Sequence, residues 1–335
     1  MGILNKARVV VASLDSAGST HISHDLQTIR RIYGEWGGAE WIWETDAPPV
    51  LPSQIGTPAS AIGMPKLGQT KLALTWHSPD SNKTRNVSGL EEVGLDVSKG
   101  AGFHRSPTID FGVVLFGELE LEVEGAGTVL LSQGSSWVLT GQNHIWHNPG
   151  SEDCVCMTFM MGAEERPFEE AYVAPNTQDA SPPLVRHALS AYDAENRAIF
   201  ISSECPVERS YNDTASGTWI WEAPQSPTIP DQVGGVPTLM GMPTSDSVKF
   251  GIQTFKSAGT AVGKDLAKRS HHATDSIEFA VILSGELEID FPDCDSLRLS
   301  KGSFLIHAGV PHVWRSVGQE PCKCAMISLG ANRLS

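Results

Sequence analysis

An internal repeat is the feature that most constrains how this chain can fold. Residues Trp41–Glu44 recur as Trp219–Glu222, at an offset of 178 residues, and the offset becomes 168 from His104 and His272 onward. Two constant offsets that each relate many identical residues do not arise by chance, so the chain is two copies of one domain. The smaller second offset means that the first copy carries ten additional residues, which we place in the polar stretch 81–98.

The repeat predicts two domains in tandem. We expect an N-terminal domain at 1–175, a linker at 176–184 and a C-terminal domain at 185–335. The linker is placed there because residues 176–183 (NTQDASPP) are polar and rich in proline. A length of 335 residues suits two domains of ordinary size.

Each copy has the pattern of an all-β domain. Residues 118–124 and 286–291 alternate acidic and apolar side chains, and short apolar runs are separated by Gly, Asn, Ser and Pro. This pattern predicts a barrel or sandwich of short strands. Two segments, 24–36 and 163–172, have the pattern of short helices. We expect Trp41 and Trp43, like Trp219 and Trp221, on one face of a strand, in the core or packed between the two halves.

Composition argues against several classes of partner. The chain has 24 Lys and Arg against 39 Asp and Glu, a net charge of −15, so we expect neither a nucleic-acid nor a membrane partner. No apolar run is long enough to span a bilayer, and six cysteines in this length do not form a disulfide scaffold. We therefore expect a cytoplasmic protein. We expect no nucleotide cofactor, because the sequence lacks a glycine-rich phosphate loop.

Two histidines and one carboxylate occur at the same spacing in both copies. They are His104, Asp110 and His144 in the first copy, and His272, Glu278 and His312 in the second. Imidazole and carboxylate groups are good ligands for divalent transition metals, of which we expect Fe(II), with Mn, Ni, Cu or Zn as alternatives. In a pocket without metal, His144 or His312 could act as a general base with Asp110 or Glu278.

These residues resemble the two sequence motifs of the cupin superfamily. The end of the first motif is matched by Asp110 with Gly117 and by Glu278 with Gly285, and the second by Gly141 with His144 and by Gly309 with His312. The resemblance covers both halves and implies a bicupin, in which two jelly-roll barrels are related by duplication. The usual second histidine of the first motif is replaced by Ser106 and Thr274.

The resemblance also implies a function. Cupins similar to 3-hydroxyanthranilate dioxygenase hold iron with three ligands, at the positions of His272, Glu278 and His312. This implies a metal-dependent enzyme that acts on a small organic molecule inside a barrel, with dioxygenase chemistry as the first choice. A decarboxylase, isomerase or dehydratase is the alternative, and a non-catalytic small-molecule-binding or storage-like bicupin is the third. Because Asp110 is one methylene shorter than Glu278, we expect the second barrel to bind metal more tightly.

The resemblance further implies a homodimer, because single cupins commonly pair through their sheet faces. Light scattering at micromolar concentration should give the mass of two chains. A mass of one chain would contradict this prediction.

Overall fold

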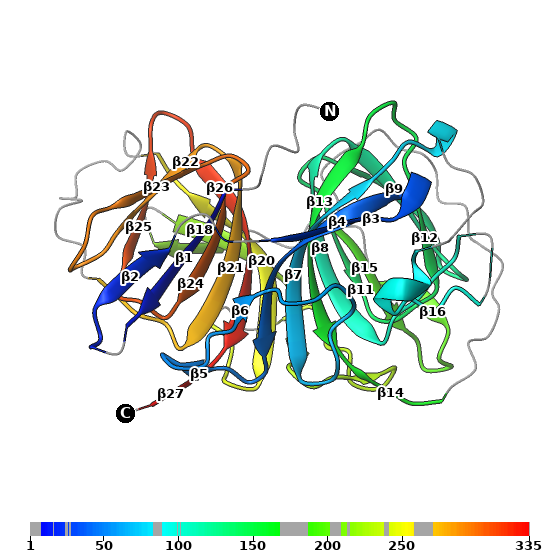
Figure 1. Ribbon diagram of the computed structural model, residues 1–335, viewed down its shortest axis with the longest axis horizontal. Coiled ribbons are helices and arrows are strands. Elements are labelled where there is room, and N and C mark those ends of the chain that lie inside the picture. Colours follow the sequence, from blue (N-terminus) through cyan, green and yellow to red (C-terminus); the bar gives the residue numbers. More distant parts are fainter. Residues whose placement is uncertain are drawn as a thin grey trace.

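The chain forms two β-barrels that lie side by side (Figure 1). The structure, a computed structural model, describes residues 8–15, 17–23, 26, 28–82, 89–98, 100, 102–167, 187–201, 209–212, 215–237, 241–257 and 271–334. Regular structure in these residues is nearly all strand, which confirms the all-β prediction. The predicted linker at 176–184 lies outside the described residues.

The first barrel consists of a large sheet and a small sheet. The large sheet contains β3 (Ile29–Ile32), β4 (Gly37–Asp46), β7 (Gln69–His77), β13 (Cys154–Gly162), β8 (Thr108–Phe116) and β11 (Ser136–Leu139). The small sheet contains β10 (Gly127–Ser132), β9 (Glu118–Val123) and β12 (His144–His147).

The second barrel repeats this arrangement. Its large sheet contains β17 (Arg209–Asn212), β18 (Ala215–Pro224), β20 (Ser247–Phe255), β26 (Cys322–Gly330), β21 (Ser276–Ser284) and β24 (Phe304–Ala308). Its small sheet contains β23 (Leu297–Ser300), β22 (Glu286–Asp290) and β25 (Val313–Val317). The order of matched strands is the same in both barrels, as expected for a duplication.

Each half of the chain gives its first hairpin to the sheet of the other half. The hairpin of β1 (Val9–Leu14) and β2 (Thr20–Ser23) joins the second barrel, where β1 pairs in parallel with β24. The hairpin of β15 (His187–Tyr192) and β16 (Ala198–Phe200) joins the first barrel, where β15 pairs in parallel with β11. Each of these two hairpins therefore belongs to one half of the sequence and to the barrel formed by the other half.

Short strands make a second reciprocal link between the halves. β14 (Glu164–Glu165) pairs with β19 (Thr228–Ile229), and β27 (Asn332–Arg333) pairs with β5 (Val50–Leu51). The remaining short elements are β6 (Thr57–Pro58) and the 3-10 turns η1 (Gly34–Trp36), η2 (Asp80–Asn82) and η3 (Glu91–Val93).

A continuous hydrophobic core joins the two barrels, because their large sheets face each other. The ring centroids of Phe111 and Phe250 lie 5.7 Å apart, and those of Phe159 and Phe279 lie 5.1 Å apart. Burying one such side chain contributes ~1.5–3 kcal/mol relative to leaving it exposed. The two barrels are therefore packed together as the two sheets of a single core.

The two predicted helices are wrong where the structure describes them. Within 24–36 the chain forms strand β3, paired with β4 through Ile29 and Trp41, followed by the single turn η1. Pairing with a neighbouring strand outweighed the local helical pattern there. Within 163–172 the described part contains strand β14, and residues 168–172 lie outside the described residues.

The expectation for the Trp-x-Trp pair is confirmed in part, because Trp41 and Trp43 are both buried core residues but do not share a face. The pairing of β4 with β7 shifts between Trp41 and Trp43, which is the mark of a β-bulge. As a result Trp43 lies in the core between the barrels, whereas Trp41 lines a cavity inside the first barrel. A bulge breaks the two-residue period on which the prediction depended.

Within the described residues, no helix has the length and apolar character needed to cross a membrane.

His187 is a buried imidazole at the contact between an exchanged hairpin and the first barrel. The side chain is 2% exposed, and its Nδ1 lies 2.6 Å from Ser136 Oγ. Burial lowers the pKa of His187 to about 4, from an ordinary value of 6.5. The fold therefore favours the neutral form, so this stabilisation is complete above pH 6.5 and is lost as the pH falls toward 4.

We expect the wild-type protein to lose up to about 3 kcal/mol of unfolding free energy relative to His187→Gln when the pH falls from about 7 to about 4. Urea denaturation at each pH measures the difference. His21→Gln, on the exposed part of the other exchanged hairpin, is the control and should show no such change. Parallel losses in the wild type and His187→Gln would contradict the prediction.

Candidate functional site

Strand alternation places one carboxyl group inside each barrel. On β8, Phe111 belongs to the core between the barrels, so the neighbouring Asp110 points the opposite way, into the first barrel. On β21, Phe279 faces that core, and Glu278 points into the second barrel. The predicted carboxylates thus occupy matched places in the two lumens.

In the second barrel the carboxyl group lies in a row of polar side chains. Glu278 on β21 is directly opposite His307 on β24 and Ser328 on β26. Glu278 Oε2 lies 3.6 Å from His307 Nδ1. Glu278 Oε1 accepts hydrogen bonds from Thr274 Oγ1 at 3.2 Å and Ser276 Oγ at 3.4 Å. The carboxyl group is therefore held in one orientation, with one oxygen toward His307.

In the first barrel the same row is apolar apart from the carboxyl group. Asp110 on β8 is opposite Leu139 on β11 and Met160 on β13. With His104 and His144, Asp110 lines a cavity of about 120 Å³. Much of the remaining wall is aromatic, and is formed by Tyr33, Trp36, Trp41, Trp76, Trp137 and Trp146. The first lumen is therefore a mainly apolar pocket that contains a few polar groups.

The two predicted histidines of each barrel are in contact. Backbone bridges join His104 to His144 and His272 to His312, with ring centroids 4.4 and 4.5 Å apart. Nδ1 lies near a backbone carbonyl oxygen in His104 (3.1 Å), His144 (2.9 Å) and His312 (2.7 Å). A carbonyl oxygen only accepts, so Nδ1 carries the proton and Nε2 keeps its lone pair. This is the form in which an imidazole binds a metal.

Burial disfavours the charged forms of the titratable side chains in both lumens. Desolvation raises the pKa of Asp110 and that of Glu278 to about 7. Desolvation also lowers the pKa of His312 to about 3, and it holds the pKa values of His144 and His307 well below the ordinary range. The imidazoles are therefore unprotonated at neutral pH, as metal ligands or proton acceptors must be.

Several buried polar atoms of the second barrel lack a hydrogen-bond partner in the described part of the chain. They include both ring nitrogens of His307, Nε2 of Gln253 and Oγ of Ser328. In the first lumen, Oδ1 of Asp110 also lacks a hydrogen-bond partner among the described residues. An unsatisfied buried polar group costs ~1–3 kcal/mol, so several in one lumen call for an explanation such as a bound ligand. This makes the second lumen the stronger candidate for a polar site.

Two lumen histidines were not identified from the sequence. His307 stands where the first half has Leu139, and its ring centroid lies 4.2 Å from that of His312. His77, which lines the cavity of the first barrel, stands where the second half has Phe255. A search for histidines shared by both halves passes over both residues. The signal that could have found them is their place on the lumen side of a strand.

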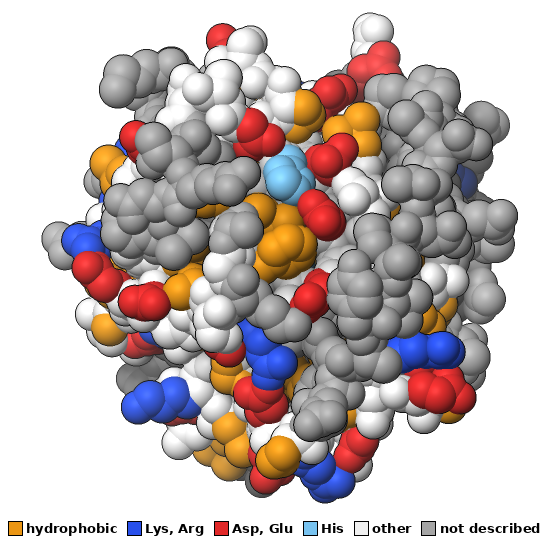
Figure 2. Space-filling view, turned by 90° about the vertical axis from the view of Figure 1, so that its right-hand side faces the viewer, with side chains coloured by type: hydrophobic (Ala, Val, Ile, Leu, Met, Phe, Trp, Pro, Cys, Tyr) orange, Lys and Arg blue, Asp and Glu red, His pale blue; other side chains and the backbone are white. Residues whose placement is uncertain are grey.

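The outer face of the first barrel is distinct from the lumen. Acidic side chains gather around a histidine on this side of the molecule (Figure 2). His147, on β12, lies with Nε2 3.0 Å from Glu122 and with Nδ1 3.7 Å from Asp80. His147 is therefore a partner of surface carboxylates and not a member of the lumen set.

The lumen residues fit a metal in their chemistry, although their side chains do not converge on one point. Across the described residues, no group of three or more His, Cys, Asp or Glu side chains is arranged to hold a metal ion as it lies. The donors themselves suit a transition metal, since neutral imidazoles and a carboxyl group line the second lumen and both nitrogens of His307 lack hydrogen-bond partners among the described residues. The structure links Glu278 to the His272–His312 pair through His307.

Two jelly-roll barrels related by duplication, each with a carboxyl group in the lumen and a pair of contacting histidines, define the architecture of a bicupin, although His272 is the exposed member of its pair. No family model matches the chain. Solved structures similar to it include AerE from Microcystis aeruginosa, at 14% identity and a TM-score of 0.45 over 90% of this chain and 96% of that one. A cupin 2 conserved barrel domain protein from Leptotrichia buccalis has 11% identity and a TM-score of 0.39, over 77% and 83% of the two chains.

Two curated relatives match parts of the sequence. The oryzines biosynthesis cluster protein J of Aspergillus oryzae is 55% identical over 47 residues, which is 14% of this chain and 26% of the relative. The phomopsin biosynthesis cluster protein C' of Diaporthe leptostromiformis is 36% identical over 66 residues, which is 20% of this chain and 34% of the relative. The chain therefore matches only a minor part of either relative's length.

The unsatisfied nitrogens of His307 should lower the stability of the metal-free protein. We expect His307→Leu, which introduces the residue of the matched position, to raise the unfolding free energy by ~1–3 kcal/mol after dialysis against EDTA. The reciprocal variant Leu139→His should lower it by a similar amount. Urea denaturation measures both. Destabilisation by His307→Leu would show that the imidazole is already satisfied in the fold.

Proposed function

We propose that this bicupin is an enzyme that converts a small organic molecule in its second barrel, with a transition metal bound there. The observation that carries the proposal is the buried row of Ser328, Glu278 and His307 beside His312, in which several polar atoms lack partners. A fold keeps such an arrangement at a cost in stability, which a bound ion and substrate would offset.

The proposal assigns a role to each side chain. His272, Glu278 and His312 would hold the metal, and His307 adds a fourth donor that the sequence pattern did not include. A bound Fe(II) would supply Lewis acidity and redox chemistry toward O2, with open positions for a chelating substrate. His312 is kept in the correct tautomer by the Val310 carbonyl oxygen, and Thr274 and Ser276 orient the carboxyl group of Glu278.

Dioxygenase-type chemistry is the first candidate reaction, because two or three neutral histidines with one carboxylate suit Fe(II). Decarboxylation, isomerisation or dehydration is the second candidate. It is favoured by the position of Glu278 Oε2 beside His307 Nδ1, since a buried carboxyl group next to a neutral imidazole can pass a proton to or from a substrate. The names of the two sequence relatives, both from biosynthesis clusters, support a small organic substrate in either case.

Metal content tests the choice of barrel. Protein purified without chelator or affinity metal should contain about one transition-metal ion per chain, as one set of three or four donors implies. Glu278→Gln should lower this content at least about tenfold, since loss of a charged ligand removes a large part of the affinity. Asp110→Asn is the matched control in the first barrel and should leave the content unchanged. If Asp110→Asn removes the metal and Glu278→Gln does not, the active barrel is the first.

Reaction assays separate the two candidate reactions. Oxygen uptake with catechol or acetylacetone as probe would support dioxygenase chemistry. Release of CO2 from oxaloacetate, or exchange of its carbon-bound protons in D2O without oxygen uptake, would support the second candidate. In either case Glu278→Gln should abolish the reaction. Activity that survives in Glu278→Gln would place the chemistry outside the second barrel.

A further inference from the structure

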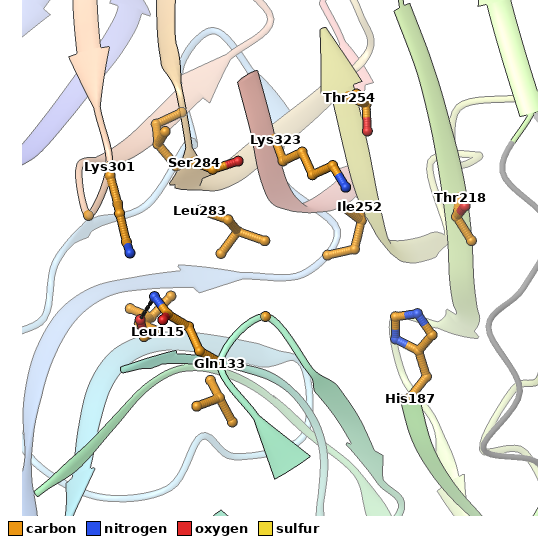
Figure 3. A pocket seen from close by; sticks show the side chains of 14 residues that line it. Leu115, Gln133, His187, Thr218, Ile252, Thr254, Leu283, Ser284, Lys301 and Lys323 are labelled. Carbon is orange, nitrogen blue, oxygen red and sulfur yellow. Dashed lines mark hydrogen bonds between the residues drawn. The ribbon is translucent and has the colours of Figure 1, made fainter. Parts of the chain in front are cut away.

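A cleft lies between the two barrels, and none of the predicted site residues line it. Its volume is about 440 Å³, within the range of ~300–1,000 Å³ that is usual for small-molecule sites. Both halves of the chain form its walls: Leu115 and Gln133 lie on one side and Leu283 and Lys301 on the other (Figure 3). A ligand bound there would contact both barrels at once.

The two halves have diverged at this cleft in size and in charge. Leu115 matches Leu283 and Gly134 matches Gly302 in the repeat, so the cleft is built on positions that the duplication shares. Other lining residues of the second half differ from their matched residues. Thr254 stands in place of Trp76, Lys301 in place of Gln133 and Lys323 in place of Val155. A smaller side chain and two positive charges therefore occur together on one side.

The two lysines bring uncompensated positive charge to the cleft. Their side chains extend toward the space between the barrels (Figure 3). Among the described residues, the side chains of Lys301 and Lys323 form no ion pair and no hydrogen bond. The described lining residues include no Asp or Glu. In a chain with a net charge of −15, a cleft with two cations and no anion favours an anionic ligand.

The floor of the cleft is apolar. Leu115, Ile252 and Leu283 are partly buried and pack against the core between the barrels, which leaves their remaining surface toward the cleft. Apolar surface next to cations matches a molecule with a hydrocarbon body and an anionic head.

We propose that this cleft binds a small amphipathic carboxylate. Its carboxylate group contacts the ammonium groups of Lys301 and Lys323, and its hydrocarbon body lies on Leu115, Ile252 and Leu283. The proposal is independent of the chemistry assigned to the second lumen. Because the ligand contacts both halves, its binding also stabilises the packing of one barrel against the other.

Sodium decanoate is a suitable probe, with binding measured by isothermal titration calorimetry and by the shift in melting temperature. We expect the double variant Lys301→Gln/Lys323→Val, which takes the residues of the matched positions, to bind decanoate at least about tenfold more weakly. Thr254→Trp should block binding by filling the cleft. Lys66→Gln, a lysine outside the cleft, should bind as the wild type does. Raised salt should weaken binding to the wild type more than to the double variant.

Three results would overturn the proposal. The first is no binding of decanoate by the wild type at millimolar concentration. The second is equal binding of decanoate by the wild type and the lysine double variant. The third is equal binding of decyltrimethylammonium, a cation with the same hydrocarbon body. Loss of decanoate binding in Glu278→Gln, with the lysine variant unaffected, would place the probe in the second lumen and would also count against the cleft.

Discussion

Hydrophobic packing between the two large sheets is the interaction on which the rest of the structure depends. Because successive side chains of a strand point to opposite faces, the residues that fill this core fix which residues enter the lumens. Phe111 and Phe279 in the core commit Asp110 and Glu278 to the interiors of their barrels. A shift of one residue in either strand would send the carboxyl group into the core. The alternation of side chains along these strands thus determines both the packing of the core and the position of the carboxyl groups.

The duplication has produced two lumens of different character on one backbone plan. In the first, Leu139 and Met160 flank the carboxyl group, and aromatic rings surround the cavity. In the second, His307 and Ser328 occupy the matched places, with polar atoms that the fold itself leaves unsatisfied. The apolar arrangement favours stability and the polar one favours binding. This is the usual trade-off between stability and function. The polar lumen is accordingly where we place the proposed metal and substrate.

Much of the fold followed from the sequence, because the repeat and the strand pattern are local or periodic signals. The paired histidines were found for the same reason, since His104, His144, His272 and His312 recur at fixed offsets. The exchange of hairpins gave no such signal, because a strand pairs equally well with either barrel as far as its own residues show. His307 was missed because it differs between the halves, and the bulge beside Trp41 was missed because bulges interrupt the period used to assign faces.

The exchange of hairpins also bears on how the chain is made. Strand β1 is synthesised well before its partner β24, because Val9 pairs with Phe304. During translation the hairpin of β1 and β2 therefore remains without this partner strand until β24 has left the ribosome. Its apolar strand Val9–Leu14 is exposed to chaperones and to other nascent chains for that time. The second barrel can close only after β24 and β26 have been synthesised, so its completion is a long-range step in folding.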